Sequence, residues 1–528
     1  MSSEPGGRSG HPNNNAGGVR RRDAAGRERN RSTGRNRTDT APGQRTRAAD
    51  PARLVAFEVL RAVSADDAYA NLVLPARIRK HHLDRRDAGF ATELAYGALR
   101  AQGSYDAILA RCVDRPLSEV DPAIVDALRI GVHQLLAMRV PSHAALDQTV
   151  GLARAVIGAG PSGLVNAVLR KVAAKELSEW LSELTAGLSD EVKIASIEHS
   201  HPEWIVRAFR QALVAHGRDA SEVGALLEAD NAAPVVNLLA LPGLGNLDEA
   251  FDAGFTPGAL VADSALSSGG DLSRLDGVRE GTVRVQDAGS QLVARALAGV
   301  EIETTLDGGE ERWLDMCAGP GGKAALLAAL AGQKGGWLLA NEPSVHRAKL
   351  VSQALAAVPE DSWTVRTGDG RDIGREHPAA FDRVLVDAPC TGLGALRRRP
   401  ESRWRRTLAD VTELGPLQRE LLASALEAVK PGGVVAYVTC SPHVAETIAV
   451  VEDVMRRRGD VELLDAGQAL DAASLSGDVA AGNHAAAVPA HRMMAQLWPH
   501  VHQSDAMFLA LIRKNGRVPA PAPQDDQK

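Results

Sequence analysis

Between Gln286 and about Arg513 the sequence alternates short apolar, β-branched runs with longer runs rich in Ala and Leu. The short runs predict strands at 313–316, 337–340, 363–367, 381–387 and 434–439. The longer runs predict helices from about 323, from about 344 and over about 418–429. This alternation favours an open, doubly wound parallel sheet of the Rossmann-like class. Because such sheets bind ligands at the carboxyl ends of their strands, the residues that follow each strand are the candidates for a site.

The rest of the chain divides into further units. Residues 51–183 repeat apolar side chains at helical spacing between prolines, which predicts an all-α domain. Residues 184–285 predict more helices and then, from about 234, a small α/β subdomain, before the Rossmann-like domain at 286–513. Residues 1–50 and 514–528 hold almost no large apolar side chains, so we expect two disordered tails.

Charge is unevenly distributed, which limits the partners that the sequence predicts. The net charge is -6, but residues 1–50 hold eleven arginines against five acids, so this arm is basic. The arm is either a nonspecific RNA tether or a solubilising tail. We find no secretory signal and no apolar run near the ~20 residues that cross a bilayer, so we expect a cytoplasmic protein with no membrane partner. The four cysteines are too far apart for a compact metal site and are expected as free thiols.

A glycine-rich segment, DMCAGPGGK from Asp315 to Lys323, lies between a predicted strand and a predicted helix. Glycines at a helix N-terminus let backbone N–H groups approach a ligand, so the segment predicts a cofactor loop. It lacks the spacing of a strict GxGxxG motif or of a P-loop, which disfavours nucleoside triphosphates. Glu342 follows the second predicted strand, where its carboxylate can accept hydrogen bonds from ribose hydroxyls. Asp369 follows the third, where it can accept a hydrogen bond from the amino group of an adenine. A nucleoside ligand without a phosphate clamp favours S-adenosylmethionine over a dinucleotide.

Two cysteines follow the fourth and fifth predicted strands. Cys390 comes shortly after Asp387, and Cys440 follows the other strand, so both thiols are expected at the edge that carries the cofactor loop. Ser441 and Pro442 predict the start of a helix, whose N-terminus would lower the pKa of Cys440 and favour its thiolate. Carbon 5 of a pyrimidine attacks a methyl donor only weakly, but thiolate addition at carbon 6 turns the ring into an enamine. The thiols therefore favour pyrimidine C5 methylation, although the residues alone leave the roles of the two cysteines open.

Four motifs in this order, DMCAGPGGK, GDGR, VDAPCTGLG and VTCSPH, resemble the RsmB/Sun family of RNA cytosine-5 methyltransferases. Upstream, residues 87–97, 129–136 and 165–171 resemble the NusB fold, a helical RNA-binding module, so the resemblance covers about 51–513. It implies that Cys440 is the nucleophile, that Cys390 assists product release and that Lys323 helps to position the cytosine. It also implies that the cofactor is bound by Cys317, Ala318, Gly319, Pro320, Gly321, Gly322, Lys323, Glu342, Asp369 and Asp387. The chain departs from the family pattern at Glu342, where Asp is usual, and at Gly319, where Ala is common.

A basic segment directly follows the VDAPC motif. It holds six arginines and a tryptophan that we predict to bind RNA: Arg397, Arg398, Arg399, Arg403, Trp404, Arg405 and Arg406. Arginines can clamp phosphates while Trp404 stacks on a base, and a solvated basic loop is the alternative. A cytosine that meets a thiol must leave its stack, so the target base is expected to be unpaired or flipped out.

These observations together predict an S-adenosylmethionine-dependent methyltransferase that acts on carbon 5 of a cytosine in small-subunit (16S) ribosomal RNA. Asp387 and Lys323 join the two cysteines as the predicted catalytic residues. The alternatives are the same chemistry on transfer RNA, and a catalytically inactive NusB-like RNA-binding factor. The target nucleotide, the oligomeric state, and the choice between naked RNA and an assembling subunit stay open.

Overall fold

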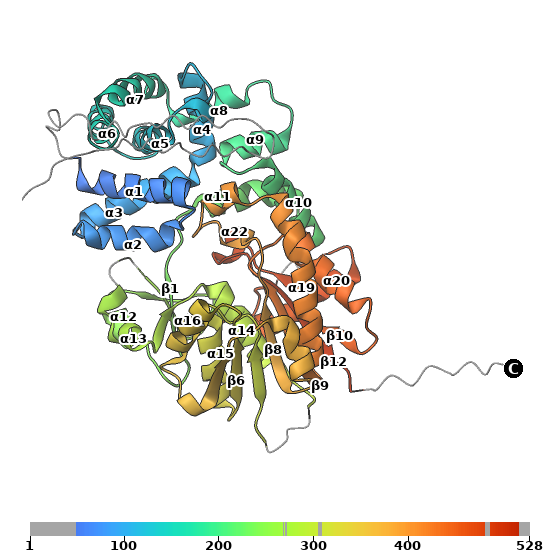
Figure 1. Cartoon of the computed structure of the whole chain (residues 1–528). Coiled ribbons are helices and arrows are strands. Elements are labelled where there is room, and N and C mark those ends of the chain that lie inside the picture. Colours follow the sequence, from blue (N-terminus) through green and yellow to red (C-terminus); the bar gives the residue numbers. More distant parts are fainter. Residues whose placement is uncertain (1–48, 268, 270–271, 305–308, 481–485, 517–528) are drawn as a thin grey trace, which may run out of the picture.

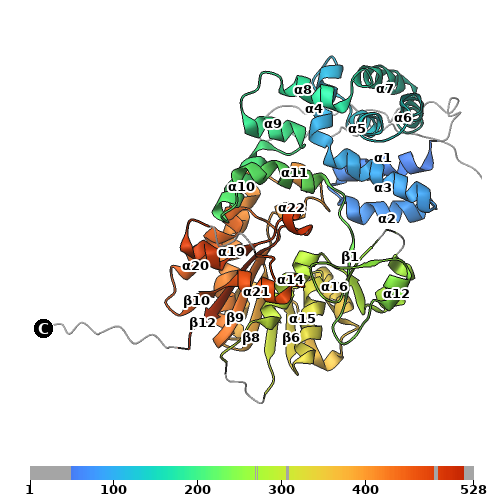
Figure 2. The same cartoon turned by 180° about the vertical axis from the view of Figure 1, so that it is seen from behind.

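The structure, a computed structural model, describes residues 49–267, 269, 272–304, 309–480 and 486–516. The predicted tails at 1–50 and 514–528 lie outside these ranges, apart from residues 49–50 and 514–516. An all-helical part and a part built on a mixed sheet lie one above the other (Figure 1), and the view from behind shows helices between them (Figure 2).

The N-terminal part is a bundle of helices. Asp50 caps the first helix by accepting a hydrogen bond from the backbone N–H of Arg53 at 2.9 Å, and Pro51 takes the first helical position, where a missing N–H does no harm. Apolar side chains at helical spacing face the core of this bundle, and Leu128 and Val132 are fully buried. The elements are α1 (Pro51–Asp66), α2 (Ala70–Lys80), α3 (Arg85–Arg100), α4 (Gln102–Cys112), η2 (Leu117–Glu119), α5 (Pro122–Leu136), α6 (Ser142–Val156), α7 (Ala159–Val172) and α8 (Leu177–Thr185).

A second group of helices connects this bundle to the sheet domain. It comprises α9 (Glu191–Glu198), α10 (Glu203–Ala215), η3 (Ala220–Glu222) and α11 (Val223–Asn231). Its apolar side chains share one buried cluster with Leu393, Leu396 and Trp498 of the sheet domain. Since Leu393 and Leu396 closely follow Cys390 in the sequence, these helices support the loop that carries that thiol.

A small antiparallel sheet follows, with strand order β2-β3-β1-β4. Its elements are β1 (Asn237–Ala240), α12 (Asp248–Asp252), β2 (Thr256–Pro257), β3 (Ser264–Leu266), η4 (Leu272–Arg274), α13 (Asp276–Glu280) and β4 (Val283–Val285). This subdomain has its own small core around Leu238, Ala265 and Leu275.

The C-terminal domain is an eight-stranded sheet in the order β10-β12-β9-β8-β5-β6-β7, with β11 paired to β12. The strands β5 to β9 pair in parallel, whereas β10, β11 and β12 are antiparallel, so the predicted parallel sheet has an antiparallel edge. The elements are α14 (Ala288–Gly299), β5 (Arg312–Asp315), α15 (Gly322–Gln333), β6 (Trp337–Asn341), α16 (Val345–Leu355), η5 (Glu360–Ser362), β7 (Trp363–Arg366), η6 (Gly370–Asp372), α17 (Ile373–Glu376), β8 (Phe381–Asp387), η7 (Leu393–Ala395), α18 (Ser402–Arg405), α19 (Leu408–Ala428), β9 (Val429–Thr439), η8 (Val444–Glu446), α20 (Ile448–Met455), β10 (Val461–Leu464), α21 (Ala466–Ala473), η10 (Pro489–Met493), β11 (Ala495–Gln496), α22 (Pro499–His502) and β12 (Phe508–Lys514).

Helices cover both faces of this sheet, as a doubly wound fold requires. One core lies under α14, α15, α16 and α21, and the other under α17, α19 and α20. The predicted fold class is therefore confirmed. Every helix in the described ranges is too short or too polar to cross a bilayer.

Candidate active site

The predicted site residues gather along one edge of the sheet. Asp315 ends β5, Glu342 follows β6, Asp369 follows β7, Asp387 ends β8 and Cys440 follows β9. Because these strands are parallel, their carboxyl ends meet at one edge, as the sequence predicted.

The glycine-rich loop connects β5 to the N-terminus of α15. Gly321 has φ 108°, a left-handed value that favours glycine, and a Cβ there would lie 2.4 Å from the Cβ of Ala354 on α16. Gly321 therefore lets the loop turn tightly under α16 and leaves the first N–H groups of α15 at the end of the loop. A helix N-terminus of this kind favours polar and anionic groups of a ligand.

Asp315 is fully buried at the start of this loop. Apart from a weak contact with the backbone of Cys317, its carboxylate oxygens have no hydrogen-bond partner among the described residues. Burial, and then the charge of Asp387, raises the pKa of Asp315 to about 7. A buried carboxyl that lacks partners fits a ligand that brings its own donors, such as the amino and hydroxyl groups of S-adenosylmethionine.

Glu342 and Gly319, the two departures from the family pattern, contact each other. Glu342 is 1% exposed, and its carboxylate accepts hydrogen bonds from the backbone N–H of Gly319 at 3.2 Å and of Ser344 at 3.0 Å. Arg347 Nη2 lies 3.6 Å from the same carboxylate. A Cβ at Gly319 would lie 2.2 Å from Glu342 Oε2, so the longer acid occupies the space of an alanine methyl group.

Asp369 lies in the turn after β7 and is already paired. Its carboxylate accepts hydrogen bonds from the backbone and the guanidinium of Arg371, and these bonds lower its pKa. The predicted adenine contact of Asp369 stays a prediction. Asn341, beside Glu342, donates to the carbonyl of Met316 at 3.0 Å and thereby holds the cofactor loop against β6.

The two thiols that follow β8 and β9 lie side by side, with 3.4 Å between Cys390 Sγ and Cys440 Sγ. The hydrogen bond between them lowers the pKa of Cys440 and raises that of Cys390. At this distance either thiol can donate to the other, so the pair can share one proton, and the lowered pKa favours Cys440 as the one that loses its proton first. The geometry thus brings the two cysteines together, and the directions of their pKa shifts agree with Cys440 as the nucleophile.

The predicted helix directly after Cys440 is wrong. Residues 441–443 have no regular secondary structure, a 3-10 turn covers Val444–Glu446, and α20 begins only at Ile448. Several polar groups at Ser441 and Thr447 are used by side-chain hydrogen bonds, which compete with a regular first turn. The lowered pKa of Cys440 therefore comes from Cys390, with the charge of Lys323 acting in the same direction, and not from a helix N-terminus.

Lys323, at the start of α15, donates to Asp387 at 2.9 Å. Burial alone would lower the pKa of Lys323, but the charge and hydrogen bond of Asp387 outweigh it and the pKa is raised. The raised pKa favours a charged ammonium group at the end of the cofactor loop, close enough to act on Cys440, where it can stabilise a thiolate or an electron-rich ring.

Sequence reasoning missed two buried acids near the thiols. Asp505 pairs with Arg398 and lies among the charges that act on Cys440. Glu446 is fully buried and accepts hydrogen bonds from Thr391 and Ser441, the residues that follow the two cysteines. An acid six residues after Cys440 within the apolar run VAETIAVV was the available signal.

The basic segment is largely an interdomain contact, which corrects part of the RNA-binding prediction. Arg403 is fully buried and donates to the carbonyls of Arg100, Ser200 and Asp230 and to Asn231. Arg405 donates to the carbonyls of Val63, Asp67 and Ala68 at the end of α1. Neither guanidinium is free for phosphate.

The other members of the segment differ in exposure. Arg397 is buried beside Asp287 and Asp505, and Arg406 is paired with Asp410. Arg398 is partly exposed but its guanidinium is paired with Asp505, Arg399 is exposed, and Trp404 is 36% exposed, so RNA contacts by these three stay a prediction.

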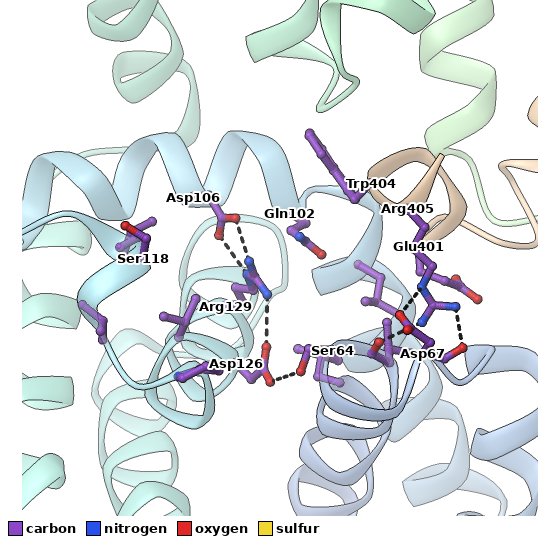
Figure 3. A pocket seen from close by; sticks show the side chains of 17 residues that line it. Ser64, Asp67, Gln102, Asp106, Ser118, Asp126, Arg129, Glu401, Trp404 and Arg405 are labelled. Atoms are coloured by element: carbon purple, nitrogen blue, oxygen red, sulfur yellow. Dashed lines mark hydrogen bonds and ion pairs between the residues drawn. The ribbon is translucent and has the colours of Figure 1, made fainter. Parts of the chain in front are cut away.

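Trp404 and Arg405 also line a pocket of about 460 Å³ between the two domains. Figure 3 shows Arg129 facing Asp106 and Asp126 on one side of this pocket, and Arg405 reaching the end of α1 near Asp67 on the other. The carboxylates of Asp106 and Asp126 therefore pair with the guanidinium of Arg129 and balance its charge within the pocket.

Comparison with known proteins agrees with this architecture. A family model described as "16S rRNA methyltransferase RsmB/F" matches residues 304–513, and one described as "NusB family" matches residues 50–174. "Putative methyltransferase Rv1407" of Mycobacterium tuberculosis H37Rv is 47% identical over 469 residues, covering 88% of this chain and 97% of that protein. "Probable ribosomal RNA small subunit methyltransferase B" of Synechocystis sp. PCC 6803 is 30% identical over 482 residues, covering 88% and 99%.

The fold also matches a solved structure. The protein PH0851 superposes with a TM-score of 0.70 at 20% identity, covering 89% of this chain and 100% of that one. The family models and the relatives above, rather than this fold match, confirm the predicted family and the predicted cofactor. The chain belongs to the RsmB/F methyltransferase family and is an S-adenosylmethionine-dependent RNA methyltransferase.

Proposed function

We propose that this chain transfers a methyl group from S-adenosylmethionine to carbon 5 of a cytosine in small-subunit ribosomal RNA, through a covalent bond between Cys440 and carbon 6. The observation that carries the proposal is the pair of thiols 3.4 Å apart, at the same sheet edge as the glycine-rich loop and the Lys323–Asp387 pair. Methylation of an exocyclic amine would need neither thiol.

The chain's own residues account for the order of events. The Cys440 thiolate adds to carbon 6, which makes carbon 5 nucleophilic. Bound S-adenosylmethionine supplies an electrophilic methyl group at carbon 5. Lys323 stabilises the negative charge that forms on the ring, and Asp387 holds the ammonium group of Lys323 in place. A base then takes the proton from carbon 5, and the electron pair of that bond expels Cys440 from carbon 6 as a thiolate. Cys390 assists this release by its hydrogen bond to the departing sulfur, which leaves both thiols as they were at the start.

The substrate is inferred from the relatives and from the domain architecture. Relatives named as small-subunit ribosomal RNA methyltransferases cover most of the chain, and the NusB-like bundle suits RNA binding. We propose that residues 51–183 and the exposed arginines bind RNA, that residues 286–513 carry out the reaction, and that the reaction takes place in the cytoplasm.

Two single substitutions test the chemistry. We expect Cys440→Ala to abolish methyl transfer, and Cys390→Ala to leave a protein–RNA adduct that survives denaturing electrophoresis. Adduct formation by Cys440→Ala would reverse the assigned roles, and wild-type turnover by both variants would exclude covalent catalysis.

The substrate requires a separate test. The full chain is incubated with deproteinised 16S RNA, with small subunits, and with transfer RNA, and the modified base is mapped by bisulfite sequencing. We expect a 5-methylcytosine in 16S RNA. Modification of transfer RNA alone, or of none of these RNAs despite cofactor binding, would reject the ribosomal assignment.

A further inference from the structure

Glu446, in the 3-10 turn after Cys440, is fully buried. Its carboxylate accepts hydrogen bonds from the backbone N–H of Thr391 at 2.7 Å, from Thr391 Oγ1 at 2.5 Å and from Ser441 Oγ at 2.6 Å. Gln418 Nε2 lies 3.4 Å away as a weaker donor. Within the described ranges, no Lys, Arg or His nitrogen forms an ion pair with Glu446, so neutral donors alone hold this carboxylate.

The positions of these donors connect the two thiols. Thr391 directly follows Cys390, and Ser441 directly follows Cys440. One side chain therefore binds the residue after each cysteine, although the two cysteines come from different loops. Hydrogen bonds to a charged acceptor contribute about twice as much as neutral ones, so this bridge is a strong constraint on the relative position of the loops.

Neighbouring contacts make the bridge rigid. The backbone carbonyl of Glu446 accepts a hydrogen bond from Tyr437 Oη at 2.9 Å, which fixes the 3-10 turn against β9. The backbone N–H of Gly394 donates to the carbonyl of Cys440 at 2.8 Å, which adds a second connection between the loops. Gln418 also donates to the carbonyl of Pro389 at 2.9 Å, just before Cys390.

The charge of Glu446 also acts on the thiol of Cys390. It is one of the causes that raise the pKa of Cys390, after the hydrogen bond with Cys440, burial and the charge of Cys440. The largest charged contributions at Cys440 come from Asp387, Lys323 and Asp505. The charge of Glu446 therefore adds to the groups that favour the protonated form of Cys390.

We infer that Glu446 is a positioning residue that holds the two thiol loops in register, so that Cys390 and Cys440 stay within hydrogen-bond distance and can share one proton. This inference rests on the proposed function, because the proposed reaction uses both thiols. Glu446 acts through Thr391 and Ser441 and touches no substrate atom.

The test measures the thiols directly in the full-length chain, without RNA or cofactor. Initial rates of alkylation by iodoacetamide are followed against pH, with Cys390 and Cys440 resolved as separate peptides by mass spectrometry. We expect wild-type Cys440 to react at a lower pH than Cys390. In Glu446→Gln, which keeps the size but removes the charge, the Cys390 midpoint should fall by about one pH unit, because a nearby negative charge no longer opposes its thiolate.

Activity should change in parallel. We expect Glu446→Gln to lower kcat for methyl transfer about 10- to 100-fold with little change in KM for RNA, as for a loss of alignment. Glu446→Asp, which keeps the charge, should restore part of the midpoint separation. Glu452→Gln on α20 removes a nearby acid that does not touch either thiol loop and should behave as wild type.

Unchanged midpoints in a folded Glu446→Gln variant would overturn the inference. If that variant does not fold, Ser441→Ala decides the question, since it removes one bond of the bridge and leaves the charge. A several-fold loss of kcat would support the bridge, and an unchanged kcat would overturn it. Because alkylation needs no RNA, a wrong substrate assignment would leave these thiol midpoints intact and show itself only in the methylation assay.

Discussion

The contact between Gly319 and Glu342 predicts that the two positions depend on each other. A Cβ at Gly319 would lie 2.2 Å from Glu342 Oε2 and 2.9 Å from two nitrogens of Arg347. Ordinary contact distances are about 3.5 Å, so the overlap with Glu342 exceeds about 1 Å. Arg347 is half exposed and can move aside, but Glu342 is buried and held by two backbone N–H groups.

The cost of Gly319→Ala follows from these bonds. The carboxylate must shift and lose its bond from the Gly319 N–H, and a hydrogen bond to a charged group contributes about 1.5–3 kcal/mol. If this loss appears in cofactor binding, the Kd rises about 10- to 150-fold. Glu342→Asp alone shortens the acid and should cost about 1–2 kcal/mol through stretched bonds.

The double variant tests whether the effects of the two substitutions on cofactor binding depend on each other. An aspartate leaves room for the alanine methyl group, so Gly319→Ala/Glu342→Asp should lose at least about 1.5 kcal/mol less than the two single changes added together. Isothermal titration calorimetry of S-adenosylmethionine with the full chain measures each Kd. Binding is preferable to global unfolding here, because multidomain chains unfold in more than one step.

Gly332→Ala on α15 is the matched control, since a Cβ there meets nothing within 4 Å. Its Kd should equal that of the wild type. Additivity of the two single changes to within about 0.5 kcal/mol would refute the proposed compensation.

Three further outcomes can be measured. The pKa of Asp315 is raised from the ordinary 3.8 to about 7 in the folded state. In the ligand-free full chain, the free energy of the transition that unfolds the catalytic domain should therefore fall by up to about 4 kcal/mol as pH rises from 4 to 7. Asp315→Asn should remove this component of the urea midpoint's pH dependence, and identical pH profiles for the two proteins would contradict it. Arg403→Ala leaves several buried oxygens without a donor and should weaken the domain contact by about 3 kcal/mol or more, seen as faster hydrogen exchange in α11. The partly exposed Arg406→Ala should leave this exchange unchanged, and equal exchange in both variants would show that Arg403 does not hold the contact. Arg399→Ala should reduce the slope of log Kd for RNA against log salt by about 1, and an unaltered slope would remove Arg399 from the RNA surface.

The positions of the site residues were predictable because they depend on local patterns. Each parallel strand ends where its apolar run ends, so the order of motifs alone places Asp315, Glu342, Asp387 and Cys440 on one edge. The start of α19 also had a local signal that the prediction overlooked. Thr407 and Asp410 form a capping box, and the helix begins at Leu408, ten residues before the predicted start at about 418.

Features that depend on distant partners were not predictable. A run of arginines looks the same whether it faces solvent or meets carbonyls from elsewhere, and Arg403 lies 303 residues from its partner Arg100. The thiolate of Cys440 was expected from a helix that the local side-chain hydrogen bonds displace, whereas its actual cause, Cys390, lies on a different loop. Glu446 escaped notice for the same reason, since its role exists only once both loops are in place.

The guanidinium of Arg405 supplies hydrogen-bond donors to the C-terminal end of α1, and this has a consequence for biosynthesis. It donates to the carbonyl of Val63, and 342 residues separate the two. At about 5–20 residues per second, a ribosome needs roughly 20–70 s to make that interval. During this time the carbonyls at the end of α1 can hydrogen-bond only to water. They gain their protein donor only after the segment that carries Arg405 has been synthesised and has docked.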